Sequence, residues 1–124
     1  MNIGKCHCGN VEISLDRLPA SLTSCNCSIC NRLGALWGYY KPGEVTVKVG
    51  NDTTVEYKWG DEYIIFHHCP ICGCATHYTT TEKLKNEHNE ERVGINFRIF
   101  SLEEIKEIKV KRFDGADTWK YLKD

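Results

Sequence analysis

Eight cysteines in three short clusters give this 124-residue sequence its clearest chemical potential. The clusters are Cys6 and Cys8; Cys25, Cys27 and Cys30; and Cys69, Cys72 and Cys74. In a reducing compartment, cysteines at this density serve metal binding or redox chemistry more often than disulfides. Two cysteines in C-x-C spacing are hard to bridge to each other, whereas both sulfurs can face one metal ion. The pattern therefore favours thiolate ligation over a disulfide framework.

The third cluster contains the motif C-P-x-C-G, which is typical of a zinc knuckle. Its two-residue gap turns the chain so that the sulfurs of Cys69 and Cys72 face one point, and Gly73 tolerates positive φ. A knuckle supplies only two ligands, and Cys6 and Cys8 are the obvious second pair. We predict a closed four-thiolate zinc site that stabilises the fold.

The triplet Cys25, Cys27 and Cys30 lies in one tight loop. Three thiolates can face one zinc ion and leave the fourth position to water or substrate, which is the arrangement of catalytic zinc. Zinc in such a site lowers the pKa of a bound thiol or acts as a Lewis acid on a carbonyl oxygen. We expect this open site to hold zinc less tightly than the closed one.

Several residues near the triplet are candidates for contacting substrate. Arg32 follows the last cysteine by two residues, and either binds the carboxylate of a thiol substrate or neutralises the thiolates. Trp37, Tyr39 and Tyr40 either wall a pocket or pack within a sheet. The sequence offers no obvious general base.

The remaining cysteine and the histidines have alternative interpretations. Cys74 is a buried small apolar side chain, a reactive thiol or the fourth ligand of the triplet. His67 and His68 point to opposite faces of a strand, where packing or surface exposure is expected and support of the sulfurs is the alternative. The C-x-x-C spacing from Cys27 to Cys30 also occurs in thiol–disulfide enzymes. Those enzymes use a βαβ context, which this sequence lacks.

The elements that must position these cysteines are mostly short strands. Turn signals separate segments rich in β-branched and aromatic residues, at 11–15, 35–40, 45–49, 53–59, 63–67, 75–80, 92–100 and 108–113. That spacing predicts a mostly antiparallel β domain. We expect a helical turn at 28–33, a short helix at 101–107 begun by a capping box, and an exposed loop at 82–91.

Length and charge restrict the class of protein. A chain of 124 residues is expected to form a single domain, residues 1–124. Its 16 basic and 17 acidic residues give a formal charge of −1, which argues against a nucleic-acid partner. The sequence shows no secretory signal or membrane span, so we expect a cytoplasmic protein without a membrane partner. The oligomeric state is left open.

Three ordered motifs carry a resemblance to a known family. They are G-x-C-x-C-G-x-V at residues 4–11, C-x-C-x-x-C-x-R-x-G-A at residues 25–35 and C-P-x-C-G at residues 69–73. Residues 93–96 and 113–115 resemble further family segments, so that the similarity runs from Gly4 to Asp117. The sequence resembles the glutathione-dependent formaldehyde-activating enzyme family. Asn31 and Cys74 depart from it, because many members have a basic residue and a threonine there.

The resemblance implies a fold, two metal sites and a reaction. The fold is a β-tent of antiparallel sheets. The structural zinc maps to Cys6, Cys8, Cys69 and Cys72, and the catalytic zinc maps to Cys25, Cys27 and Cys30. The reaction is that of a carbon–sulfur lyase, which joins glutathione and formaldehyde to give S-hydroxymethylglutathione. The expected partners are therefore a small thiol such as glutathione and an aldehyde.

Two other functions remain as alternatives. A non-enzymatic zinc-stabilised binding or accessory domain needs only the four-cysteine site, and the triplet would then be surplus. A thiol-redox protein would use Cys27, Cys30 or Cys74. Zinc stoichiometry distinguishes the first alternative from an enzyme, and thiol titration with and without a chelator distinguishes the second.

Overall fold

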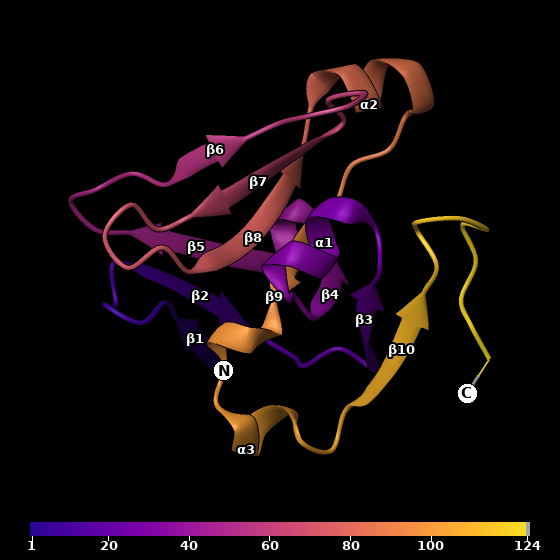
Figure 1. The fold of residues 1–124 in the computed structure, drawn as a ribbon. Coiled ribbons are helices and arrows are strands. Elements are labelled where there is room, and N and C mark those ends of the chain that lie inside the picture. The colour runs from indigo at the N-terminus through magenta and orange to yellow at the C-terminus, as the bar shows by residue number, and fades with distance from the viewer. Residues whose placement is uncertain (124) are drawn as a thin grey trace.

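The computed structural model describes residues 1–123, and its strands form two sheets (Figure 1). The smaller sheet has the order β1–β2–β5, and the larger has the order β10–β3–β4–β9–β8–β7–β6. Neighbouring strands run antiparallel except β10, which runs parallel to β3. The strands are β1 (Asn2–Lys5), β2 (Val11–Leu15), β3 (Ser21–Cys25), β4 (Trp37–Tyr40), β5 (Val45–Val49), β6 (Val55–Tyr57), β7 (Ile64–His68), β8 (Ala75–Thr80), β9 (Val93–Asn96) and β10 (Lys109–Phe113). The predicted mostly β, antiparallel arrangement is confirmed.

Short helices connect the strands. They are α1 (Ser28–Leu33), α2 (Glu82–His88), α3 (Leu102–Ile105) and the 3-10 helices η1 (Pro42–Glu44) and η2 (Phe97–Ile99). The helical turn predicted at 28–33 is confirmed as α1. Within residues 1–123, no helix is both long and apolar enough to cross a membrane.

The main apolar core includes the inner side of β2 and residues from the larger sheet. Burial alternates along β2, where Val11, Ile13 and Leu15 are buried between more exposed neighbours. They cluster with Ile95 of β9 and Phe97. Because a half-buried strand must place every second residue inward, this alternation fixes the register of β2 between β1 and β5.

Four segments differ from the sequence-based expectations. The loop expected at 82–91 is wrong, because residues 82–88 form α2. The Thr81 side chain caps its N-terminus, Leu84 is buried, and Asn89 ends it in the left-handed conformation at φ 53°. The strand expected at 92–100 ends at Asn96 and continues as η2. Strands β1 and β3 were not predicted, because their polar sequences lack clear alternation.

Candidate functional site

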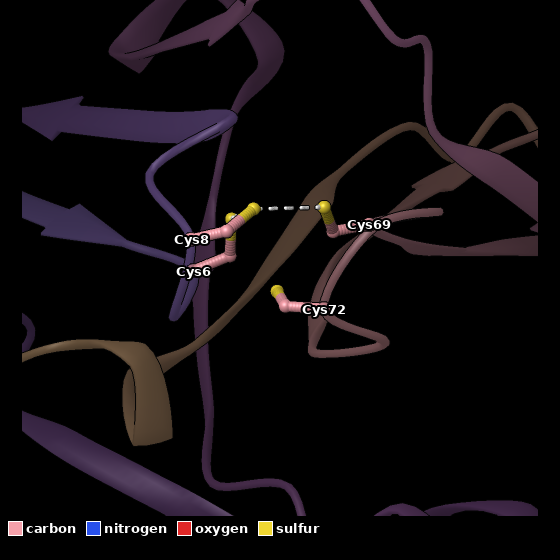
Figure 2. Close-up of side chains that lie close together, drawn as sticks. All are labelled: Cys6, Cys8, Cys69 and Cys72. Atoms are coloured by element: carbon pink, nitrogen blue, oxygen red, sulfur yellow. Dashed lines mark hydrogen bonds between the residues drawn. The ribbon is translucent and has the colours of Figure 1, made fainter.

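The four-cysteine cluster joins the turn between β1 and β2 to the turn between β7 and β8. In Figure 2, the sulfurs of Cys6, Cys8, Cys69 and Cys72 gather around one point. All four lie within 4.8 Å of one another. The Cys6 and Cys8 sulfurs are 3.8 Å apart, and the Cys8 and Cys69 sulfurs are 3.6 Å apart. The structure thus brings together the four residues that the motifs paired.

The donors and the geometry of this cluster fit zinc. Tetrahedral ligation with Zn–S bonds of about 2.3 Å places sulfurs about 3.8 Å apart, close to the separations in the cluster. Backbone N–H groups face the sulfurs: Val11 N donates to Cys6 Sγ at 3.2 Å and Ile71 N donates to Cys69 Sγ at 3.4 Å. The N–H of Cys74 is the main cause that lowers the pKa of Cys72 to about 5. These donors favour the thiolates that a metal requires.

The knuckle turn explains the roles of Gly73 and Cys74. Gly73 has φ +80° and donates its N–H to the Cys69 carbonyl at 2.9 Å. The Cys74 carbonyl accepts from Cys69 N at 3.0 Å, and the side chain of Cys74 packs against the apolar core. Cys74 belongs to neither metal-binding group of the described residues. Its place beside the first cluster therefore does not favour its interpretation as the fourth ligand of the triplet.

The triplet is built at the point where β3 passes into α1. Cys25 ends β3, Cys27 is the N-cap residue of α1, and Cys30 lies in the first turn of that helix. The three sulfurs lie within 4.8 Å of one another. Cys27 N donates to Cys25 Sγ at 3.5 Å, and Cys30 N donates to Cys27 Sγ at 3.4 Å. The hydrogen bond from Cys30 N to Cys27 Sγ, which caps the start of α1, therefore also helps to bring the thiols together.

The three thiols have different environments. Burial raises the pKa of Cys25 and of Cys30. Burial also acts to raise the pKa of Cys27, but the hydrogen bonds from Cys30 and its other neighbours outweigh it, so the pKa of Cys27 is lowered. Trp37 Nε1 donates to Cys30 Sγ at 3.3 Å. One readily ionised thiol beside two others is a donor set suited to a thiophilic divalent cation, which deprotonates the thiols that it binds.

The triplet opens onto a cavity of about 800 Å³. Its lining includes all three cysteines of the triplet and none of the four-cysteine cluster. Its described non-cysteine lining residues are Ser28, Ile29, Trp37, Tyr39, Trp59, Gly60, Asp61, Ile64, Phe66, Tyr78, Arg92, Phe113, Gly115, Ala116, Trp119 and Tyr121. Arg92 is the only lysine or arginine among them, and Asp61 is the only carboxylate. The cavity is consequently aromatic, with one cation.

The C-terminal segment forms one wall of this cavity. It runs back beside β10, where Tyr121 bridges to Phe113 (Figure 1). Asn26, between two cysteines of the triplet, donates to Asp114 Oδ1 at 3.0 Å and accepts from Ala116 N at 3.0 Å. A Cβ at Gly115 would lie 2.7 Å from Cys25 Sγ. The segment is thus fitted closely against the triplet.

Other residues that the sequence singled out lie in different places. Arg32 is exposed, donates to the Ser28 carbonyl at 2.9 Å and does not line the cavity. Trp37 and Tyr39 line it, whereas Tyr40 is buried against Phe97. His67 is buried and bonded to Thr54 and Thr79, and it joins neither cysteine group of the described residues.

The cation and two tryptophans of the cavity were not among the residues that the sequence motifs indicated. Arg92 Nε donates to the Tyr78 hydroxyl at 2.8 Å. Trp59 lies in the connection between β6 and β7, and Trp119 lies in the C-terminal segment. A tryptophan followed by the turn residues Gly60 and Asp61 was the available signal for Trp59. Nothing in the sequence around Arg92 and Trp119 connects them to the triplet.

Comparisons with known proteins agree with this architecture. Residues 1–110 match the profile of the family described as glutathione-dependent formaldehyde-activating enzyme. A crystal structure of a Rhodobacter sphaeroides protein is similar, with a TM-score of 0.67 and 28% identity over 87% of this chain and 98% of that chain. A search of curated proteins found no match. Since the family profile matches most of its length, the chain belongs to the glutathione-dependent formaldehyde-activating enzyme family.

Proposed function

We propose that this protein catalyses the joining of a small thiol to an aldehyde and the reverse cleavage, the reaction of a carbon–sulfur lyase. The family description supports a reaction of this kind, with glutathione and formaldehyde as the first pair to test. The active site is the cavity at Cys25, Cys27 and Cys30, which hold the catalytic zinc. Cys6, Cys8, Cys69 and Cys72 hold a second, structural zinc. We place the reaction in the cytoplasm, where thiols are kept reduced.

One observation carries the proposal: the three-sulfur group lines the aromatic cavity of about 800 Å³, and none of the four cysteines of the other group lines it. Four protein ligands complete a tetrahedral zinc site, whereas three leave a position for a reacting molecule. A scaffold would gain its stability from the first cluster alone. The triplet has the three ligands that a catalytic metal needs, and the cavity gives a substrate access to it.

The reaction is balanced without another reactant. The thiol sulfur bonds to the aldehyde carbon, and the thiol proton ends on the former carbonyl oxygen. When bound, zinc supplies Lewis acidity that lowers the pKa of a thiol and polarises a carbonyl oxygen.

The aromatic lining supplies both walls and hydrogen-bond donors. Burial is the main cause that raises the pKa of the Tyr78 hydroxyl, so it stays protonated at neutral pH. The Tyr78 hydroxyl accepts from Arg92 Nε, which leaves its own proton free to donate to a substrate oxygen. Trp37 packs edge-on to Tyr78 at a centroid distance of 5.0 Å and fixes the ring in place.

The metal assignment is tested by elemental analysis of purified protein. We expect two zinc ions per chain, and one in Cys27→Ser. Cys74→Ser is the matched control, because Cys74 belongs to neither group of sulfurs, and it should keep both. One zinc per chain that is unaffected by Cys27→Ser would instead favour a non-enzymatic scaffold.

The activity is tested by the rate of thiol–aldehyde exchange. The adduct also forms without an enzyme, so NMR exchange spectroscopy of glutathione and formaldehyde must show a faster exchange with protein than without. Cys27→Ser should abolish the acceleration and Cys74→Ser should retain it. Reversible oxidation of Cys27 and Cys30 to a disulfide, in place of metal binding, would favour the thiol-redox alternative.

A further inference from the structure

Aromatic side chains are concentrated around the cavity. All three tryptophans of the sequence line it, at positions 37, 59 and 119. Five other aromatic residues also line it: Tyr39, Phe66, Tyr78, Phe113 and Tyr121. Phe66, Tyr78 and the buried Trp37 pack against one another. Because these three rings are already buried against one another, they form the inner wall of the cavity and need no ligand to cover them.

A second set of aromatic residues is exposed. Trp59 is 47% exposed and Trp119 is 70% exposed, and Tyr39 and Tyr121 are similarly open to solvent. They come from separate parts of the chain, namely the β6–β7 connection, β4 and the C-terminal segment. Exposed apolar surface gathered at one concave site marks a ligand-binding surface more often than isolated exposed rings do. These rings are thus available to contact a bound molecule.

Trp119 is held in an unusual backbone conformation. Its φ is 59°, in the left-handed region that bulky residues seldom adopt. Its N–H donates to the Asp114 carbonyl at 2.8 Å, and its ring packs edge-on to Phe113 at 5.1 Å. Strained residues that the surrounding structure holds in place cluster at binding sites. The turn therefore presents this ring at the cavity, outside the segment that matches the family.

Charge in the cavity is sparse. Arg92 is held by Tyr78, and its contact with the exposed Glu90 is long at 3.5 Å. Among residues 1–123, nothing accepts a hydrogen bond from its Nη2. Arg92 is the one described cation of the lining, so it can match one carboxylate. A tripeptide such as glutathione brings two carboxylates and an ammonium group; Asp61 can match the ammonium group, but the described lining has no second cation for the second carboxylate.

We infer that the cavity selects a thiol that carries an aromatic ring and a single carboxylate. The ring contacts Trp59 and Trp119, and the carboxylate binds Arg92, while the sulfur reaches the triplet. This inference rests on the proposed function, because that function assigns the sulfur to the triplet. It adds the class of the thiol substrate, which depends in part on Trp119, a residue outside the segment that matches the family.

A ligand series on the unmodified, zinc-loaded protein tests the inference by calorimetry. The probe 3-phenyl-2-sulfanylpropanoate has the thiol, the ring and the carboxylate. 2-Sulfanylpropanoate lacks the ring, 2-phenylethanethiol lacks the carboxylate, and glutathione is the family's thiol. We expect the complete probe to bind at least about tenfold more tightly than each of the others, since burial of a phenyl ring or a charge-assisted hydrogen bond gives about that factor.

Variants then assign the two contacts. Trp119→Ala should weaken the binding of the complete probe about tenfold and leave that of 2-sulfanylpropanoate unchanged. Tyr57→Ala removes an exposed aromatic ring outside the cavity and should change neither. Arg92→Met should remove the advantage of the complete probe over 2-phenylethanethiol, whereas Arg32→Met should retain it.

The outcomes separate this inference from the proposed function. Glutathione binding as tightly as the complete probe, or Trp119→Ala leaving its binding unchanged, would overturn the inference even if exchange is accelerated. Ring-dependent and carboxylate-dependent binding without accelerated exchange would support the ligand class and count against the lyase reaction. The ligand series decides the question even if Arg92→Met does not fold, because it needs no variant.

Discussion

The four-cysteine cluster and the triplet use the same side chain but are built differently. The first joins Cys8 to Cys69, which are 61 positions apart, and it buries Cys6 and Cys69. The second lies within six residues of one loop, and its cysteines are only partly buried. A metal in the first cluster cross-links two distant turns, whereas a metal in the second links residues that the start of α1 already gathers.

The two clusters share some features and differ in others that bear on their proposed roles. Both clusters surround their sulfurs with backbone N–H groups and contain thiols with a lowered pKa, namely Cys69 and Cys72 in the first and Cys27 in the second. They differ in the number of sulfurs, four in the first and three in the second, and in what lies beside the position that a fourth ligand would take. The triplet has an aromatic cavity there, which the C-terminal segment completes. The proposed function therefore assigns stability and catalysis to separable groups of residues.

The largest expected effect is the loss of the closed site. Cys69→Ser removes a buried ligand, and structural zinc contributes about 10 kcal/mol or more in small domains, which is comparable to the whole stability of a domain of this size. We expect Cys69→Ser to lose its cooperative unfolding transition and Cys27→Ser to keep it. Thermal unfolding followed by circular dichroism measures both. Equal loss of folding in the two variants would contradict the separation of the sites.

Both clusters could be predicted from the sequence because short motifs define them. Within residues 25–30, and separately within residues 69–73, the short spacing alone turns the sulfurs of that motif toward a common point. The cavity could not be predicted in this way. The parallel pairing of β10 with β3 places Phe113 beside Cys25 and brings the C-terminal segment to the triplet. Sheet order of this kind depends on tertiary packing, which local patterns do not record.

The same distinction explains the secondary structure. Strands with apolar alternation, such as β2 and β5, begin and end where the sequence indicated. The helix α2 was missed because only Leu84 among its residues is buried. Its stability depends on the caps Thr81 and Asn89, which the charged composition concealed.

The next largest effect concerns the affinity of the triplet for zinc, and it distinguishes this site from the four-cysteine cluster. Gly115→Ala would place a Cβ 2.7 Å from Cys25 Sγ, which is too close for a real contact, so the sulfur or the segment must shift. We expect the affinity of the triplet for zinc to fall about 10-fold to 100-fold, as for lost supporting groups in other metal sites. Competition with a chelator measures it. Gly43→Ala, where the added Cβ meets open space, should leave both affinities unchanged.

A pH-dependent effect belongs to the strands beside the closed site. His77 pairs with His67 across β8 and β7, and the rings stack at 4.3 Å. Burial lowers the pKa of His77 to about 3 from the usual 6.5. The unfolded state therefore takes up a proton first as the pH falls. The contribution of this group is complete above pH 6.5 and is lost between 6.5 and 3, by up to about 1.4 kcal/mol per pH unit.

Urea unfolding of the unmodified protein and His77→Gln between pH 7 and 5 isolates this contribution. Acid also weakens metal binding, but it does so in both proteins, so the difference between their pH slopes reports on His77. We expect a shallower slope in His77→Gln and an unchanged slope in the exposed control His88→Gln. Parallel slopes for all three proteins would show that His77 does not drive the loss of stability.

The smallest effect tests how the triplet is joined to the wall of its cavity. Asn26 lies between Cys25 and Cys27, yet its side chain bonds to Asp114 and Ala116 rather than to a sulfur. Because it is exposed, Asn26→Ala should cost only about 1 kcal/mol or less. Hydrogen exchange should nevertheless increase at residues 114–121 and stay constant at residues 69–73. Asn31→Ala, on the exposed face of α1, is the control. Faster exchange at the knuckle would mean that the two clusters are coupled, contrary to the comparison.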